Sequence, residues 1–144
     1  MTMEPIYSIT LEAEPKDSDI NAVVMGLAEF NRLQTGAAMP EYLLATVRDH
    51  EGALAGGLLG AFYLGWLQIH SVWLPDGLRG QGIGRNLMAV AEKEAVRRGC
   101  ERVFLETFNF QALPFYEKCG YSIFSRLPDF PPGGARYALT KNLL

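Results

Sequence analysis

The spacing of apolar residues along the chain predicts two long helices. Apolar positions recur every three or four residues over 20–30, after a helix-capping candidate at Asp17 or Ser18, and the pattern ends at Gly36. A second pattern of the same period covers 83–98. Its apolar stripe, which should face a core, consists of Ile83, Leu87, Ala91 and Ala95.

Shorter apolar runs predict strands between and after these helices. Two runs, 53–64 and 66–74, lie in a stretch without a charged residue between Glu51 and Asp76. That stretch is long enough to cross a bilayer, but its glycines and the mixed charge of its flanks favour two buried strands joined by a turn. The other expected strands are 6–11, 41–49, 102–108, 121–127 and 136–143, and a short helix is expected over 111–120.

This order of elements indicates an α/β fold in a single domain over residues 1–144, without internal repeats or linkers. The formal net charge of -3 provides no basic surface for a nucleic acid, and we expect neither a nucleic-acid nor a membrane partner. The two cysteines, Cys100 and Cys119, have neither metal-site spacing nor the density of a secreted scaffold. We therefore expect a cytoplasmic protein without a metal, and the first ten residues lack the pattern of a signal peptide.

Four glycines and two arginines lie between the second apolar strand and the second helix, in the segment LPDGLRGQGIGRNLM at 74–88. A glycine-rich turn at the start of a helix presents backbone N–H groups to an anion, and phosphate is the usual one. A P-loop would need lysine and then serine or threonine after Gly84, where Arg85 and Asn86 stand. A dinucleotide fingerprint fails as well, because positions 85 and 87 are not glycine.

The run Arg79-Gly80-Gln81-Gly82-Ile83-Gly84 resembles the R/Q-x-x-G-x-G/A signature of the GNAT superfamily of N-acetyltransferases. A second segment, Phe115-Tyr116-Glu117-Lys118-Cys119-Gly120-Tyr121, is similar to the FYEKLGF segment of the same superfamily. By element order the resemblance covers about 41–143. It implies a mixed, mostly antiparallel central sheet with helices on both faces. It also implies that the strand before the glycine loop splays from the strand that follows.

The resemblance further implies that the glycine loop holds the pyrophosphate of acetyl-CoA, while pantetheine lies between 72–74 and 104–108. Asn109 resembles an asparagine that reaches the pantetheine, although asparagine at that place is also a good helix cap. The cofactor-binding residues implied in this way are Val72, Trp73, Leu74, Arg79, Gly80, Gln81, Gly82, Ile83, Gly84, Arg85, Asn109, Phe115 and Tyr116.

Direct acetyl transfer needs a neutral amine, donors for the oxyanion and a proton donor for the departing thiolate. Tyr116 stands where the family carries its tyrosine and is the expected proton donor, the alternative being an aromatic residue that only packs a helix. His70, which shares a strand face with Trp66 and Gln68, is one candidate base. Glu106 on the next strand is another, and a water chain without a dedicated base is a third.

The resulting hypothesis is an acetyl-CoA-dependent N-acetyltransferase acting on the primary amine of a small molecule or peptide. The alternatives are a non-catalytic acetyl-CoA-binding sensor or interaction module, and a glycine loop that is purely structural. A homodimer is possible because members of the family often dimerise. For the acceptor we consider residues 21–40 and the loop 127–134, in which Asp129 could meet an ammonium group. An aromatic pocket could be lined by Tyr63, Trp66, Phe110 and Phe130, unless these rings belong to the core.

Overall fold

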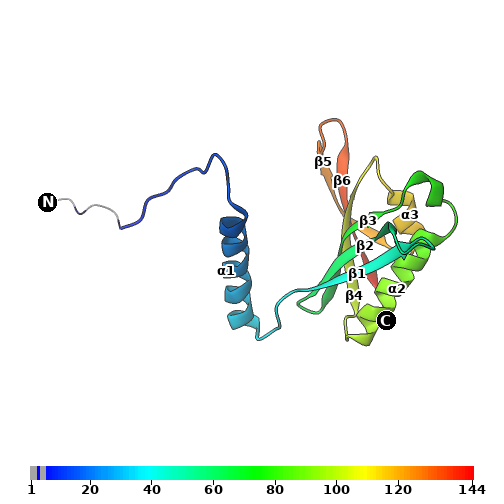
Figure 1. The fold of residues 1–144 in the computed structure, drawn as a ribbon, viewed down its shortest axis with the longest axis horizontal. Helices are drawn as coiled ribbons and strands as arrows, with labels where there is room; N and C mark the ends of the chain where they lie inside the picture. The colour runs from blue at the N-terminus through cyan, green and yellow to red at the C-terminus, as the bar shows by residue number, and fades with distance from the viewer. Residues whose placement is uncertain (1–2, 4–5) are drawn as a thin grey trace. The chain divides into compact units, whose positions relative to one another are not determined.

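The computed structural model describes residue 3 and residues 6–144 (Figure 1). The chain divides into two compact units, Met1–Met39 and Pro40–Leu144. The first unit contains helix α1, Asp17–Thr35. It begins one residue after Lys16, which makes no side-chain cap, so the capping role expected for Asp17 or Ser18 is not observed. At its other end the prediction is confirmed, since the N–H of Gly36 donates to the Arg32 carbonyl oxygen at 2.9 Å.

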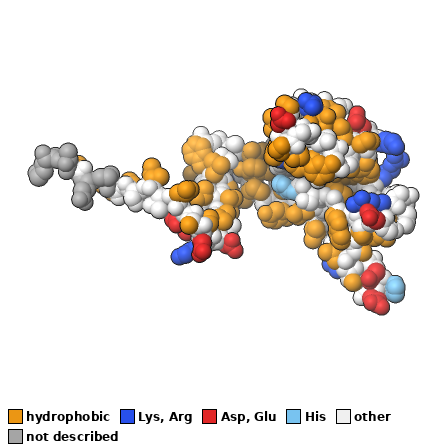
Figure 2. All heavy atoms as spheres, turned by 90° about the horizontal axis from the view of Figure 1, so that it is seen from above, with side chains coloured by type: hydrophobic (Ala, Val, Ile, Leu, Met, Phe, Trp, Pro, Cys, Tyr) orange, Lys and Arg blue, Asp and Glu red, His pale blue; other side chains and the backbone are white. Residues whose placement is uncertain are grey.

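The expected strand over 6–11 is wrong, because these residues form no ladder with any strand. Their alternating apolar side chains are exposed, with Ile9 fully accessible at 103%. Alternation alone does not make a strand, since a strand requires a partner for its backbone hydrogen bonds. Apolar side chains also occupy much of the surface seen in Figure 2.

The second unit is built on a six-stranded sheet with the order β1-β2-β3-β4-β6-β5. Neighbouring strands are antiparallel except for the central pair, β3 and β4, which is parallel. Each strand lies within one residue of its predicted bounds. The strands are β1 (Glu41–Arg48), β2 (Leu54–Tyr63), β3 (Trp66–Trp73), β4 (Arg102–Phe108), β5 (Ser122–Pro128) and β6 (Ala135–Asn142).

The uncharged stretch between Glu51 and Asp76 forms the antiparallel hairpin of β2 and β3, joined at Leu64 and Gly65. The prediction of two paired strands is thereby confirmed. Among the described residues, no helix is long and apolar enough to cross a membrane.

Two helices and one short turn complete the second unit. They are α2 (Ile83–Arg97), α3 (Leu113–Lys118) and a 3₁₀ turn at Asp76–Leu78. Helix α2 packs on β1, β2 and β3 through the predicted stripe, of which Leu87, Ala91 and Ala95 are buried. Tyr116 of α3 joins the same core, so both helices contribute to one face of the sheet, and helices on both faces remain a prediction.

The core lies between this sheet face and the two helices. Its fully buried members come from four strands and α2, which means that the sheet and α2 stabilise each other through shared apolar contacts. The largest of these side chains are Leu58, Leu67, Met88, Val103, Leu105 and Leu139.

Replacing Leu139 with alanine should lower the free energy of unfolding by about 2–5 kcal/mol, because the substitution leaves a cavity in a close-packed core. The measurement is urea denaturation followed by circular dichroism. Leu144→Ala is the matched control, since the same side chain is 83% exposed at that position and its loss should change stability by less than about 0.5 kcal/mol. Equal effects of the two substitutions would contradict the core assignment.

Candidate active site

The strands β3 and β4 separate at the centre of the sheet. Their parallel ladder ends at the pair Ile69 and Leu105, so the last residues of both strands are not paired with each other. At this point His70 has no partner on β2, and such an extra residue bends its strand. Beyond it the alternation resumes one residue out of phase, with Val72 and Leu74 packed against the core. This geometry is compatible with the splay that the family resemblance implies.

The separation of the two strands opens a cavity of about 1080 Å³. Most of the predicted site residues line it, including both candidate bases and the expected proton donor. These lining residues are His70, Val72, Trp73, Leu74, Arg79, Gly80, Gly82, Gly84, Arg85, Glu106, Phe115 and Tyr116. The structure thus brings together two segments, 70–85 and 106–116, that are separated in the sequence by α2.

The glycine loop leaves the start of α2 open to this cavity. Gly80 and Gly82 adopt positive φ angles of 76° and 81°, and a Cβ at either position would meet nothing within 4 Å. Gly82 precedes the helix without a side-chain cap, and no acidic residue lies in the first turn. The free N–H groups and the helix dipole therefore favour an anion here. This cradle fits a pyrophosphate group.

The two arginines of the loop are held differently. Arg79 folds back along the loop, where its Nε donates to the Leu74 carbonyl oxygen at 3.0 Å and its Nη1 lies 3.2 Å from Oδ1 of Asp76. Arg85, in the first turn of α2, lies beside Cys119, and its charge opposes the increase that burial causes in the pKa of that thiol. Both side chains line the cavity and bring positive charge to the anion cradle.

Three of the predicted cofactor residues do not line the cavity. Gln81 donates from Nε2 to the Gly77 carbonyl oxygen at 2.9 Å, and Ile83 packs against the core. Asn109 accepts a hydrogen bond on Oδ1 from the Ala135 N–H at 3.0 Å. The capping alternative for Asn109 is wrong, because α3 begins after Ala112 and has no side-chain cap.

Tyr116 is almost completely buried, with 8% of the residue exposed, yet it lines the cavity. Its ring packs edge-on against Phe115, with the ring centroids 5.1 Å apart. Burial raises the pKa of Tyr116 to about 12, and the nearby Cys119 thiol adds to the shift. The phenol therefore stays protonated through the neutral range, as a proton donor requires.

A half-buried ionic network fixes the end of the helix that carries Tyr116. Lys141 Nζ lies 2.8 Å from Glu92 Oε1 and donates to the Cys119 carbonyl oxygen at 2.8 Å. The hydroxyl of Tyr121 donates to Glu92 at 3.0 Å, and burial together with this carboxylate raises the pKa of Tyr121. The network thereby joins α2 and β6 to the end of α3, the helix that carries Tyr116.

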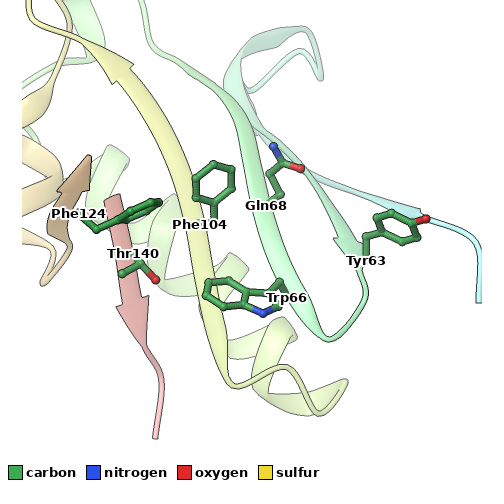
Figure 3. Close-up of a pocket in the computed structure, with 6 residues that line it drawn as sticks. All are labelled: Tyr63, Trp66, Gln68, Phe104, Phe124 and Thr140. Atoms are coloured by element: carbon green, nitrogen blue, oxygen red, sulfur yellow. The ribbon is translucent and has the colours of Figure 1, made fainter. Parts of the chain in front are cut away.

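The four aromatic residues expected to form one acceptor pocket lie in separate parts of the structure. Tyr63 and Trp66 line a second hollow of about 400 Å³ on the sheet surface, together with Gln68, Phe104, Phe124 and Thr140 (Figure 3). Phe110 instead lines the main cavity. Phe130 packs edge-on against Phe108, with the centroids 5.3 Å apart. The expectation of one shared pocket is therefore wrong, because Tyr63 and Trp66 belong to the hairpin of β2 and β3, whereas Phe110 follows β4 and Phe130 lies between β5 and β6.

The cavity also contains polar residues that the sequence reasoning missed. Ser71 and Thr107 lie within strands that were recognised by their apolar residues, so these two polar positions did not stand out. Thr107 is buried, and its hydroxyl lies 3.1 Å from Oε1 of Gln111. Gln111 also accepts a hydrogen bond from the Phe108 N–H at 2.8 Å, which closes the turn after β4. Lys118 completes this group. In the part of the chain that the structure describes, no group of three His, Cys, Asp or Glu side chains is arranged to hold a metal ion.

The sequence profile of the Acetyltransferase (GNAT) family matches residues 5–121. The chain is 39% identical over 119 residues to a blasticidin-S acetyltransferase of Streptomyces morookaense, covering 81% of this chain and 88% of that protein. It is 35% identical over 107 residues to the acetyltransferase Atu2258 of Agrobacterium fabrum, covering 74% of this chain and 78% of the relative.

A crystal structure of a protein assigned as an acetyltransferase from Agrobacterium tumefaciens has the same fold, with a TM-score of 0.88 and 30% identity. The match covers 94% of this chain and 99% of the other. The family match spans more than half of the chain, and the fold agrees with it over nearly the whole length. The chain therefore belongs to the acetyltransferase (GNAT) family and is an acetyltransferase.

Proposed function

We propose that this enzyme transfers the acetyl group of acetyl-CoA directly to the primary amine of a small molecule. The observation that carries the proposal is one continuous cavity, in which an anion cradle at the start of α2 and the buried phenol of Tyr116 face the same space. A sensor that only binds acetyl-CoA would need the cradle but not the phenol. The family membership supports the same reading.

The residues that would hold acetyl-CoA are the N–H groups of the glycine loop, with Arg79 and Arg85 supplying charge. The unpaired edges of β3 after Ile69 and of β4 after Leu105 would pair with an extended, amide-containing chain in the way that a strand does. Bound acetyl-CoA supplies an activated acetyl group, which passes to the amine as a C–N bond forms and the C–S bond breaks.

Tyr116 gives its hydroxyl proton to the departing sulfur and regains one from solvent. His70 and Glu106 line the same cavity, and either residue, or water, takes the proton that the amine loses. We also propose a cytoplasmic location, where acetyl-CoA is available and where free cysteines such as Cys100 and Cys119 stay reduced.

The acceptor is proposed from the relative that acts on blasticidin S, because that protein matches most of this chain. Blasticidin S is accordingly the first acceptor to test. A protein N-terminus remains the second candidate class, since the exposed ring of Phe110 lines the cavity and is accessible from solvent.

Saturating acetyl-CoA should raise the melting temperature of the wild type, whereas NAD and ATP should not, because only a ligand of the folded state stabilises it. A hundredfold excess over Kd corresponds to about 2.7 kcal/mol. Gly82→Glu should abolish this shift by placing a carboxylate at the anion cradle. Gly52→Glu is the matched control, since Gly52 has a similar φ of 83° and open surroundings in a turn away from the cavity. An undiminished shift in the folded Gly82→Glu protein would reject the cradle.

Tyr116→Phe should lower kcat by about a hundredfold or more and leave the affinity for acetyl-CoA unchanged, because it removes only a proton donor. Single-turnover measurement of CoA release separates this step from product release. Tyr42→Phe serves as the control, since Tyr42 is 79% exposed on β1 and should have wild-type activity. Wild-type kcat in Tyr116→Phe, with chemistry limiting, would remove Tyr116 from the mechanism.

Blasticidin S should release free CoA from acetyl-CoA in the presence of the wild type, as detected with a thiol reagent and by the mass of the acetylated product. The rate should fall in Tyr116→Phe. If a different amine is acetylated and blasticidin S is not, the transfer reaction stands and this acceptor is excluded.

A further inference from the structure

An ion pair lies where β4 leaves the central ladder, at the edge of the cavity. Glu106 is the first residue of β4 beyond the parallel pairing, and Arg136 lies on β6, directly opposite Phe108. Nε of Arg136 is 2.6 Å from Oε2 of Glu106. This buried Nε has no hydrogen bond of normal geometry, so the contact is one between charges rather than a directed hydrogen bond.

Two aromatic rings hold the Arg136 side chain. Its guanidinium carbon lies 5.3 Å from the centroid of the Phe108 ring and 5.1 Å from that of Phe130. The two rings stand at 84° to each other, so they contact the guanidinium from different directions. Because a cation is attracted to the face of an aromatic ring, these contacts restrict the orientation of Arg136.

The backbone beside Arg136 is fixed as well. Asn109, just after β4, accepts a hydrogen bond from the Ala135 N–H on its side chain and donates its own N–H to the Ala135 carbonyl oxygen, both at 3.0 Å. The loop before β6 is closed by the Asp129 N–H, which donates to the Gly134 carbonyl oxygen at 2.9 Å. Asn109 therefore ties the base of this loop to the end of β4.

Glu106 retains capacity for a ligand. Its side chain lines the cavity and is 36% exposed, and Arg136 is its only hydrogen-bonding or ionic partner among the described residues. A carboxylate accepts hydrogen bonds on both oxygens. With one oxygen turned to Arg136, the other is available to an N–H group that enters the cavity.

An exposed ring lines the same cavity as this carboxylate. Phe110 stacks on Phe108, with the centroids 5.3 Å apart and the planes at 4°, and it also lines the cavity. Its side chain is 66% exposed, so the face turned away from Phe108 is accessible. A flat group on an incoming molecule would cover this face.

We propose that Glu106 and Phe110 form the acceptor subsite, that Arg136 is a positioning residue for Glu106, and that the preferred acceptors are primary amines carried next to a flat ring. The proposal rests on the proposed function. Arg136 balances the charge of Glu106, so the subsite selects by the ring more than by additional positive charge on the acceptor. A linear diamine is therefore a poorer acceptor than an arylalkylamine.

The ring preference is tested with 2-phenylethylamine, hexylamine and 1,6-diaminohexane as acceptors. The wild type should show a kcat/KM for 2-phenylethylamine about two- to tenfold above that for hexylamine, the range expected for one aromatic pair, and 1,6-diaminohexane should not exceed hexylamine. Phe110→Leu should bring the ratio of the first two amines close to one. Phe124→Leu is the matched control, because Phe124 is 59% exposed on β5 and does not line this cavity. An equal preference in the wild type, or one unchanged in Phe110→Leu, overturns the proposal.

The positioning role is tested by a double-mutant cycle. Arg136→Gln should lower kcat/KM for 2-phenylethylamine at least about tenfold without changing the acetyl-CoA affinity, and Arg136→Lys should recover part of the loss. In a Glu106→Gln background, Arg136→Gln should have no further effect. Arg126→Gln, an exposed arginine of β5, is the control. Equal losses in both backgrounds would show that Arg136 does not act through Glu106.

Calorimetric titration of the CoA-loaded wild type with 2-phenylethylamine and hexylamine provides a readout that does not require turnover. Tighter binding of 2-phenylethylamine, lost in Phe110→Leu and kept in Phe124→Leu, supports the subsite even if no acetyl group is transferred. Selective binding without acetyl transfer would reject the proposed transfer reaction but not the proposed subsite. Equal binding of both amines rejects the subsite alone, provided that the wild type still acetylates an amine.

Discussion

The short parallel ladder between β3 and β4 is the constraint on which the rest of the site depends. Both strands are anchored in the core up to Ile69 and Leu105, which are almost completely buried. Their pairing with each other ends immediately afterwards. His70 has no partner on β2, and this extra residue bends the end of β3. Because the departure point lies in the core, the cavity has a base fixed by buried residues.

From this base the two motifs converge. The strand that leaves the ladder on one side leads into the glycine loop and α2, and the strand on the other side leads into α3 and Tyr116. The ionic network of Glu92, Lys141 and the Cys119 carbonyl then fixes α3 to α2 and β6. The site is thus supported by the apolar core at the end of the parallel ladder and by an ionic network whose residues do not line the cavity.

Local patterns accounted for most of the fold because they carry a physical signal along the chain itself. The stripe of Leu87, Ala91 and Ala95 has the helical period, and all three side chains are buried in the structure. The order of strand, glycine loop and helix was sufficient to predict an anion cradle, because free N–H groups follow from the backbone at that place. The segment 6–11 shows the limit of such reasoning, because its partner cannot be read from its own alternation.

The parts of the site that the sequence did not reveal depend on residues distant along the chain. Glu106 and Arg136 meet only because β6 pairs with β4, and nothing near either residue indicates the contact. The four rings expected in one pocket separate for a similar reason, because two of them belong to the hairpin of β2 and β3, while the other two follow β4 and β5. The bulge at His70 needs the register of two strands and is likewise invisible to one segment.

Gly84 is in direct contact with the ring of Phe115, whose nearest atom would be only 3.1 Å from a Cβ at that position. The first turn of α2 and the helix that carries Tyr116 therefore touch through the Phe115 ring, with no side chain from position 84 between them. The two segments that identify the family are thus in direct contact, and a side chain at position 84 would press on the ring next to Tyr116.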